Sequence, residues 1–186
     1  MRITGGNARG IPIVVPGGGT RPTMDAVRQA LFSSLGEAVL DMNVLDLFAG
    51  SGALGMEALS RGAASATLVE QNKAACAVIH RNLEKARLQA RVICQPVTRY
   101  LRDAARGSGR FGLILADPPY SKEIPAGGEK PAETLLADVA LPDLLEDGGT
   151  FVLESGAALE IPNPWHLLRM RKYGSTCVHF LCKATA

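Results

Sequence analysis

The residues best suited to chemistry stand in a row, Asp117-Pro118-Pro119-Tyr120, directly after the apolar run 111–116. An exocyclic amine on a nucleic-acid base is a weak nucleophile, because its lone pair is delocalised into the ring. Hydrogen bonds to the Asp117 carboxylate and the Pro118 carbonyl would make that nitrogen more nucleophilic, and paired prolines hold both acceptors in place. Tyr120 offers a flat face for an unstacked base. We predict that these four residues are catalytic, although the tetrad alone also fits a rigid turn after a strand.

A second candidate site is the glycine-rich segment 50–55, which reads GSGALG. It follows the apolar run 44–48 and opens a helical pattern over 53–60, and Glu70 lies 20 residues after Gly50 at the end of the next apolar run. Glycines in such a turn let the backbone approach a ligand, and a carboxylate at that spacing can bind both hydroxyls of a ribose. The turn and its acid fit a dinucleotide as well as an adenosyl ligand.

Asp46 separates these two ligand classes. It lies near the end of the apolar run 44–48, where a carboxylate is costly to bury without a partner. A cationic amino group would be a suitable partner, whereas a pyrophosphate beside it would be repelled. We therefore predict S-adenosylmethionine, whose methionine ammonium is positive, rather than NAD. In-line placement of nitrogen, methyl carbon and sulfur would be the main contribution to transfer, with Asp117 taking the proton.

Alternating strands and helices must position these residues. The predicted strands are 44–48, 66–69, 91–94, 111–116 and 150–154, and the predicted helices are 25–35, 53–60, 73–88, 98–105 and 132–145. Such alternation favours right-handed βαβ units and a parallel sheet covered on both faces, with ligands beyond the carboxyl ends of the strands. Two further strands, 165–173 and 176–183, are joined by Gly174-Ser175 and predict an antiparallel hairpin at the sheet edge.

We expect a small extension before this domain. Residues 1–22 are predicted to form an N-terminal β-hairpin, with strands at 2–4 and 11–15, and a loop, and residues 23–186 form the α/β domain. The net charge of +2 says little about partners, but residues 1–23 and 163–186 contain basic residues and no acid. Both ends therefore fit a polyanion-binding face as well as ordinary solvated charge.

The remaining composition predicts a cytoplasmic protein without a metal. The chain has four cysteines in 186 residues, with no C-x-x-C pair and no histidine cluster, so neither a zinc site nor a disulfide framework is expected. Cys76 and Cys94 lie in apolar stretches and are expected in the core. No apolar run is long enough to span a membrane, and no signal-peptide pattern is present.

With these residues, the chain resembles the RsmD family, bacterial methyltransferases that act on the N2 of a guanine in small-subunit (16S) ribosomal RNA. The resemblance covers nearly the whole length, and its stretches are 2–6, 9–10, 21–23, 25, 27–28, 31–32, 45–55, 57–63 and 117–120. Many amino-methyltransferases share the glycine turn and the D-P-P-Y tetrad. The N-terminal elements, up to Arg21-Pro22-Thr23, are more specific.

The resemblance implies a Rossmann-like class I S-adenosylmethionine-dependent methyltransferase fold, with a mostly parallel seven-stranded sheet and a C-terminal antiparallel hairpin. Residues 23–186 would be the methyltransferase domain. The expected cofactor-binding residues are Thr23, Asp46, Phe48, Ala49, Gly50, Ser51, Gly52, Glu70, Gln71, Gln95 and Val97. The expected RNA-binding residues are Arg9, Arg21 and Arg28. The partner would be small-subunit ribosomal RNA, either naked or within a partly or fully assembled 30S particle.

The chain departs from the family pattern at two places. An acid commonly comes after the third strand and meets the adenine amine, but residues 94–97 contain none, so adenine recognition must use backbone groups or Gln95. The family often has a basic residue where this chain has Ala26.

Two alternative functions remain open from the sequence. An N6-adenine DNA methyltransferase would use the same tetrad, although no target-recognition domain is evident. A non-catalytic dinucleotide-binding module would bind NAD and give Asp117 no role.

Overall fold

Strands and helices alternate along most of the chain in the computed structural model, which describes residues 1–18, 22–107, 109–119 and 130–184. The helices are η1 Pro16–Gly18, α1 Pro22–Leu35, η2 Gly36–Val39, α2 Ala53–Ser60, α3 Lys73–Ala86, α4 Val97–Ala104, α5 Pro131–Leu136 and α6 Leu141–Leu144. The strands are β1 Asn43–Leu47, β2 Ser65–Glu70, β3 Arg91–Cys94, β4 Phe111–Ala116, β5 Leu145–Ser155, β6 Trp165–Tyr173 and β7 Thr176–Lys183.

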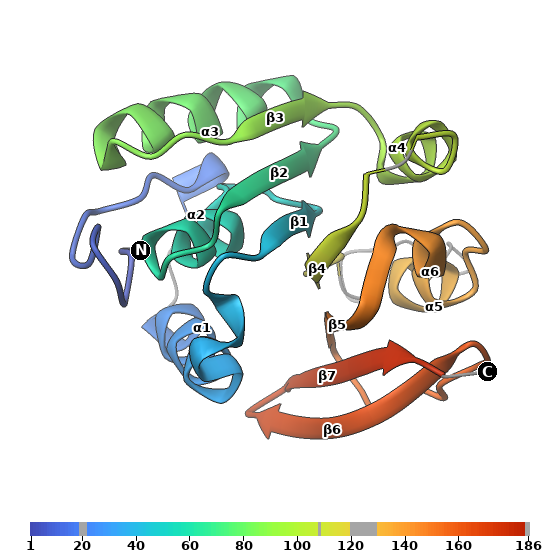
Figure 1. Ribbon diagram of the computed structural model, residues 1–186. Coiled ribbons are helices and arrows are strands. Elements are labelled where there is room, and N and C mark those ends of the chain that lie inside the picture. Colours follow the sequence, from blue (N-terminus) through green and yellow to red (C-terminus); the bar gives the residue numbers. More distant parts are fainter. Residues whose placement is uncertain (19–21, 108, 120–129, 185–186) are drawn as a thin grey trace.

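All seven strands belong to one sheet in the order β3-β2-β1-β4-β5-β7-β6 (Figure 1). The first five in this order are parallel to one another, and β7 is antiparallel to both β5 and β6. The predicted sheet, mostly parallel with a C-terminal antiparallel hairpin, is therefore confirmed. The strand order reverses between β1 and β4, and ligands of open α/β sheets bind at such a switch point, beyond the carboxyl ends of the strands.

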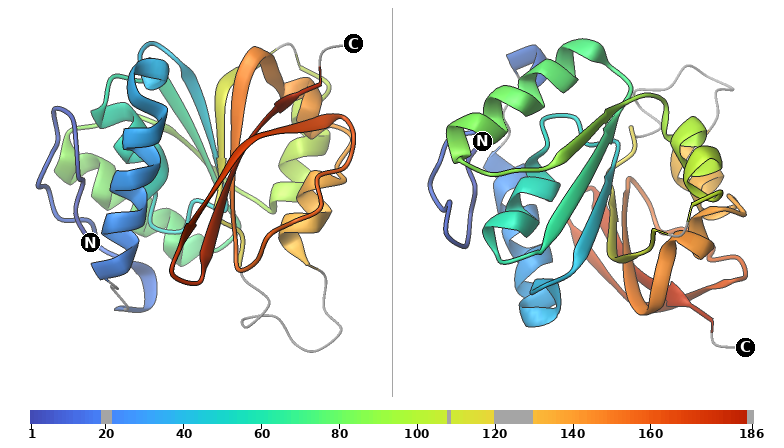
Figure 2. Two further views of the ribbon diagram at one scale, coloured as in Figure 1. Left: turned by 90° about the horizontal axis from the view of Figure 1, so that it is seen from below. Right: turned by 45° about the horizontal axis from the view of Figure 1, so that its top comes forward.

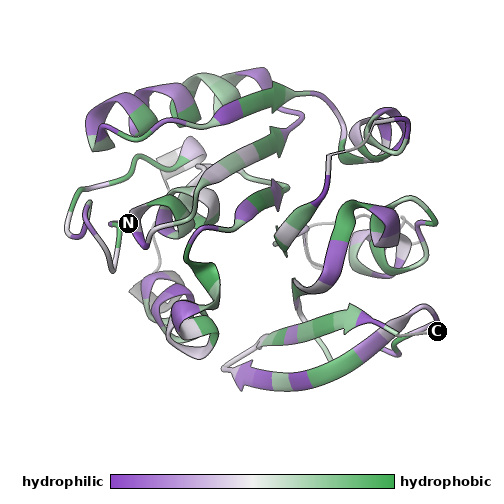
Figure 3. Cartoon of the chain, viewed as in Figure 1, coloured by the Kyte–Doolittle hydropathy of each residue, from purple (hydrophilic) through white to green (hydrophobic). Residues whose placement is uncertain are grey.

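Helices cover both faces of this sheet. α1, α2 and α3 pack on one face and α4, α5 and α6 on the other, as Figures 1 and 2 show. Successive side chains of β1 enter different cores, Val44 with the first set of helices and Leu45 with the second. Both faces are thus buried, which explains why the central strands are almost continuously apolar (Figure 3). Within the described residues, no helix has the length and hydrophobicity needed to cross a membrane.

The structure contradicts the single helix predicted over 132–145. Two short helices, α5 and α6, replace it, and the chain between them turns where the Asp138 side chain accepts a hydrogen bond from the backbone N–H of Ala140 at 2.8 Å. Pro142 then stands in the first turn of α6, where its missing N–H is harmless. The expected core position of Cys94 is also wrong, because this residue ends the edge strand β3 and is exposed, whereas Cys76 is buried.

The N-terminal segment pairs with itself and also docks on α2. Arg2 and Pro12 form an antiparallel bridge, and three backbone hydrogen bonds of 2.8–3.0 Å join residues 1–3 to residues 10–13. Its tip lies against the end of α2, where Asn7 N–H donates to the Ser60 carbonyl at 2.8 Å and Ala8 N–H donates to the Ser60 hydroxyl at 2.9 Å. The two arms of this segment therefore bond to each other, while its tip is held by the neighbouring helix.

Two glycines at this tip give a matched test of that docking. Gly6 and Gly10 both have positive φ, 75° and 87°, but a Cβ on Gly6 would lie 1.6 Å from the Ser60 carbonyl oxygen, whereas one on Gly10 would meet nothing within 4 Å. We expect Gly10→Ala to lower the free energy of unfolding by about 1–2 kcal/mol through backbone strain alone. Gly6→Ala should cost more and should speed hydrogen exchange at the Ala8 amide. Equal effects of the two substitutions would contradict this docking.

Candidate active site

The glycine-rich segment forms the turn between β1 and α2 at the carboxyl edge of the sheet. Gly50 and Gly52 have φ of 56° and 80°, a region that favours glycine. A Cβ on Gly52 would lie 3.0 Å from Leu68 Cδ2, so this glycine lets the turn pack against β2. The nearest non-neighbouring atom to a Cβ on Gly50 would be the Phe48 carbonyl oxygen at 3.9 Å. The turn is thus tightly packed at Gly52 and open at Gly50.

Two carboxylates from neighbouring strands bind the backbone of this turn. Glu70, the last residue of β2, accepts hydrogen bonds from the N–H groups of Gly50 and Asn72, each at 2.8 Å. Asp46 in β1 accepts one from the N–H of Gly55 at 2.8 Å. The amides of Gly50 and Gly55 therefore already have anionic partners within the chain.

Asp46 is a buried carboxylate whose hydrogen bonding is incomplete. Its exposed fraction is 1%, and its Oδ1 is the one buried side-chain nitrogen or oxygen without a hydrogen-bond partner among the described residues. Burial raises the pKa of Asp46 to about 7, and the nearby charges of Asp117 and Glu70 add to that rise, while the Gly55 N–H opposes it. A cation beside Oδ1 would supply the missing partner and favour the charged form.

This raised pKa predicts a pH dependence of stability. The Asp46 carboxyl ionises near 3.8 in the unfolded chain and near 7 in the folded protein, so the folded state holds more protons between those values. Raising the pH through this window should therefore lower the free energy of unfolding, by up to about 1.4 kcal/mol per pH unit. Asp46→Asn should remove this contribution, whereas Asp143→Asn, at an exposed position on α6, should keep it. Chemical denaturation from pH 4 to 8 measures both, and parallel profiles for wild type and Asp46→Asn would contradict the assignment.

The predicted catalytic tetrad begins at the end of β4, the strand next to β1. Asp117 is half-buried, Pro118 is buried and Pro119 is exposed, while Tyr120 lies outside the described residues. The effect of the Asp117 charge on the pKa of Asp46 places the two carboxylates within electrostatic reach of each other. The structure therefore brings the start of the tetrad to the edge that carries the glycine turn, as the sequence predicted.

The other predicted cofactor residues occupy positions around the same edge. Ala49 and Ser51 are buried in the turn, and Phe48 precedes it with a φ of 59°, a left-handed conformation that is uncommon for a bulky residue and marks local strain. Beyond β2 and β3, the remaining predicted residues are Gln71, which is exposed, Gln95, which is half-buried, and Val97, which is buried at the start of α4. Thr23 belongs to the first turn of α1, and its side chain is outside the described part.

Asn82 on α3 is a residue next to the glycine turn that was not predicted from the sequence. Its exposed fraction is 2%, and its amide nitrogen donates to the carbonyls of Val14 and Ser51, each at 2.9 Å. Its Oδ1 also accepts from the Val14 N–H at 2.9 Å. One buried amide thus connects the N-terminal segment to the glycine turn. Its position three residues after Ile79, on the apolar stripe of α3, is the signal that could have revealed it.

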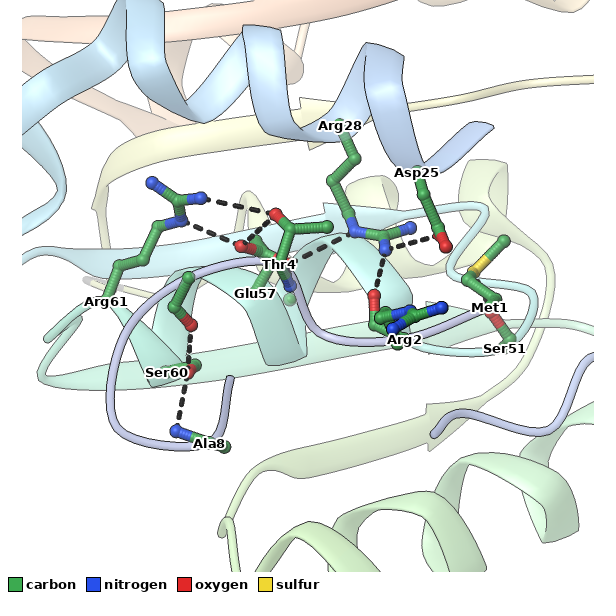
Figure 4. Close-up of polar contacts among 12 residues, drawn as sticks. Met1, Arg2, Thr4, Ala8, Asp25, Arg28, Ser51, Glu57, Ser60 and Arg61 are labelled. Carbon is green, nitrogen blue, oxygen red and sulfur yellow. Dashed lines mark hydrogen bonds and ion pairs between the residues drawn. The ribbon is translucent and has the colours of Figure 1, made fainter. Parts of the chain in front are cut away.

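The buried position of Arg28 contradicts its predicted role in RNA binding. The side chain is 3% exposed and forms ion pairs with Asp25 at 2.8 Å and with Glu57 at 3.2 Å, and it also donates to the Arg2 carbonyl (Figure 4). Glu57, which is 0% exposed, also binds Arg61 at 2.8 Å. Arg28 therefore holds α1, α2 and the N-terminal segment together and presents no charged surface to RNA.

The two other predicted RNA-binding arginines have different outcomes. Arg21 lies outside the described residues. Arg9 is exposed, but it follows Asn7 and Ala8, which bind Ser60 at the end of α2, while the glycine turn lies at the beginning of that helix. Its role in RNA binding stays a prediction.

No group of three or more His, Cys, Asp or Glu side chains suited to a metal occurs within the described ranges.

Comparison with known proteins places this geometry in a family. The family described as "Conserved hypothetical protein 95" matches residues 1–182. The chain belongs to this family. Ribosomal RNA small subunit methyltransferase D of Escherichia coli K12 is 36% identical over 185 residues, which cover 94% of this chain and 85% of that protein. The resemblance to the RsmD family predicted from the sequence is thereby confirmed.

Solved structures extend the family comparison to the fold. A hypothetical protein of Thermus thermophilus has a TM-score of 0.80 at 34% identity, covering 98% of this chain and 99% of that chain. A Thermus thermophilus 16S rRNA N2 methyltransferase, solved with AdoMet and guanosine, has a TM-score of 0.68 at 27% identity, covering 90% of this chain and 44% of that chain. The class I methyltransferase fold predicted from the family resemblance is confirmed.

Proposed function

We propose that this protein transfers a methyl group from S-adenosylmethionine to the exocyclic N2 amine of a guanine in small-subunit ribosomal RNA. The observation that carries the proposal is the pairing of the glycine turn with carboxylates. In a dinucleotide site, backbone N–H groups of this turn and of the helix it opens face the pyrophosphate. Here the N–H groups of Gly50 and Gly55 bind Glu70 and Asp46 instead. An anionic diphosphate would meet these carboxylates, whereas a cationic cofactor is favoured.

S-adenosylmethionine fits the groups that remain available. It supplies a methyl group on a sulfonium, which is already a good leaving group. Asp46 Oδ1, buried and without a partner among the described residues, would accept a hydrogen bond from the methionine ammonium. Each oxygen of Glu70 accepts one backbone N–H and keeps acceptor capacity for a ribose hydroxyl. The open space beside Gly50 lets the cofactor approach the backbone.

The tetrad supplies the acceptors for the target amine. The Asp117 carboxylate and the Pro118 carbonyl accept its two N–H groups, which increases electron density on nitrogen and holds it opposite the methyl group. Asp117 takes the proton as positive charge develops on the amine. Stacking of the base on Tyr120 completes this proposal.

The substrate assignment rests on the relatives. The Escherichia coli protein is named for the small ribosomal subunit, and the Thermus thermophilus enzyme for the N2 position of 16S rRNA. We further propose that the substrate is a partly or fully assembled 30S particle, because one small domain offers few groups for reading bases and gains specificity from a structured surface. Nothing in the described structure favours the N6-adenine DNA reaction over this one.

Labelled methyl transfer tests the function directly. The protein is incubated with radiolabelled S-adenosylmethionine and, in parallel, 30S subunits, naked 16S rRNA and duplex DNA, followed by mass analysis of nucleosides. We expect N2-methylguanosine in the RNA, with more label in particles than in naked RNA. Label in DNA on the N6 amine of adenine would overturn the assignment. Calorimetry with S-adenosylmethionine and NAD, at matched concentrations, should show heat only with the first.

A further inference from the structure

The C-terminal hairpin continues the catalytic edge of the sheet towards solvent. The end of β4, just before the predicted catalytic tetrad, is level with the end of β5, because Ala116 pairs with Leu153. The next residue of β5, Glu154, pairs with Val178 of β7, which pairs with Arg171 of β6. Three interstrand steps therefore separate the tetrad from Arg171, roughly 15 Å at the usual spacing of strands.

Two basic side chains occupy this end of β6. Arg171 and Lys172 are exposed, and within the described part of the chain neither forms an ion pair. Along the described strands, the residues between them and the tetrad are Glu154 and Val178. Both are buried, with exposed fractions of 7% and 0%, so these strand positions present little acidic surface. Arg169 on the same strand differs, because it donates to the Ser34 carbonyl and lies 4.2 Å from the Phe180 ring centroid. The two charges are thus available to an external anion, while Arg169 holds the fold.

We propose that Arg171 and Lys172 bind phosphates of the RNA strand that enters the active site. This inference rests on the proposed function and identifies where the nucleic acid lies. A strand with its target base at the tetrad covers roughly 15 Å in a few nucleotides, so its phosphates come within reach of these side chains. The surface also replaces the one predicted at Arg28, which is buried.

The charges on β6 favour RNA, rather than a second copy of the chain, as the molecule that binds this strand. β6 is an edge strand (Figure 1). It also exposes Leu167, Leu168 and Met170, which are 39%, 54% and 39% exposed. Residues 163–184 contain no acid, so antiparallel pairing of two β6 strands would bring like charges together. Basic side chains on an edge strand oppose such pairing, whereas they attract a polyanion.

A charge-reversal pair with a matched control tests the proposal. Arg171→Glu with Lys172→Glu should raise the KM for 30S subunits on the order of tenfold and lower the salt slope of RNA binding by about 1 for each phosphate that the variant no longer binds. The kcat and the affinity for S-adenosylmethionine should stay within twofold of wild type. Lys85→Glu with Arg106→Glu makes the same charge change at exposed positions in α3 and after α4, away from β6, and should leave the KM near that of wild type.

The outcomes distinguish a failure of the phosphate site from a failure of the proposed function on which it rests. If wild type methylates no RNA, the proposed function fails. If wild type methylates RNA and both variant pairs give the same KM and salt slope, the function stands and the phosphate site is overturned. Sedimentation of wild type and of the Arg171/Lys172 variant should show the same mass. A dimer that the variant disrupts would assign β6 to self-association and would also overturn the phosphate site.

Discussion

Replacing Asp117 by alanine is expected to lower kcat for methyl transfer by about 10²–10⁴-fold while the protein still folds and binds S-adenosylmethionine. The carboxylate is the side-chain acceptor that we assign to the target amine, and it comes directly after β4 at that edge. The Asp117 charge helps to raise the pKa of Asp46. Removing it should let Asp46 ionise at lower pH, so cofactor affinity should be kept or improved below pH 7.

The control for this substitution is Asp103→Ala. Asp103 is an exposed carboxylate on α4, in an ion pair of 3.7 Å with Arg99, and exposed pairs contribute little to stability. Single-turnover methylation of 30S subunits, together with calorimetry for the cofactor, measures both variants. Turnover of Asp117→Ala at the wild-type rate would remove the tetrad from the mechanism. Loss of cofactor binding would instead place Asp117 in the cofactor site.

Replacing Glu57 by alanine is expected to lower the free energy of unfolding by about 3–5 kcal/mol. Glu57 is fully buried and binds Arg28, Arg61 and both the N–H and the hydroxyl of Thr4 (Figure 4). Its removal leaves the Arg28 guanidinium buried with Asp25 as its remaining anionic partner among the described residues. An uncompensated buried charge costs far more than the net contribution of the ion pair itself.

Glu84→Ala is the matched substitution on the surface. Glu84 is an exposed residue of α3, and changes at such positions usually stay within about 0.5 kcal/mol. Urea denaturation of both variants at pH 7 gives the comparison. A loss below about 1 kcal/mol for Glu57→Ala would mean that the N-terminal segment and α1 are held mainly by apolar contacts rather than by this carboxylate.

The elements that the sequence predicted well are those defined by local pattern. The strands 165–173 and 176–183 are observed with those bounds, because alternation and the Gly174-Ser175 turn specify them locally. The helix 53–60 also has its predicted bounds, fixed by the glycine turn before it. The meeting of the glycine turn with the end of β4 followed from parallel topology alone.

The features that the sequence did not predict depend on distant partners. Arg28 looked like a surface cation, but its buried partner Glu57 is 29 residues away in the sequence. Asn82 binds Val14, 68 residues away, and no local pattern names that partner. The docking of the N-terminal tip on α2 is not predicted for the same reason, since the backbone of Ala8 binds Ser60, 52 residues away. Hydrogen bonds between residues far apart in the sequence therefore determine features that local periodicity does not specify.

The position of β7 between β5 and β6 constrains how the sheet is completed during synthesis. β6 emerges from the ribosome first, but its only strand neighbour in the described sheet is β7, so it cannot join until β7 has also been made. Until then β5 presents an open edge, the kind of surface from which nascent chains aggregate. We expect the two last strands to pair with each other through their tight turn and to add to β5 as one unit, which shortens that exposed interval.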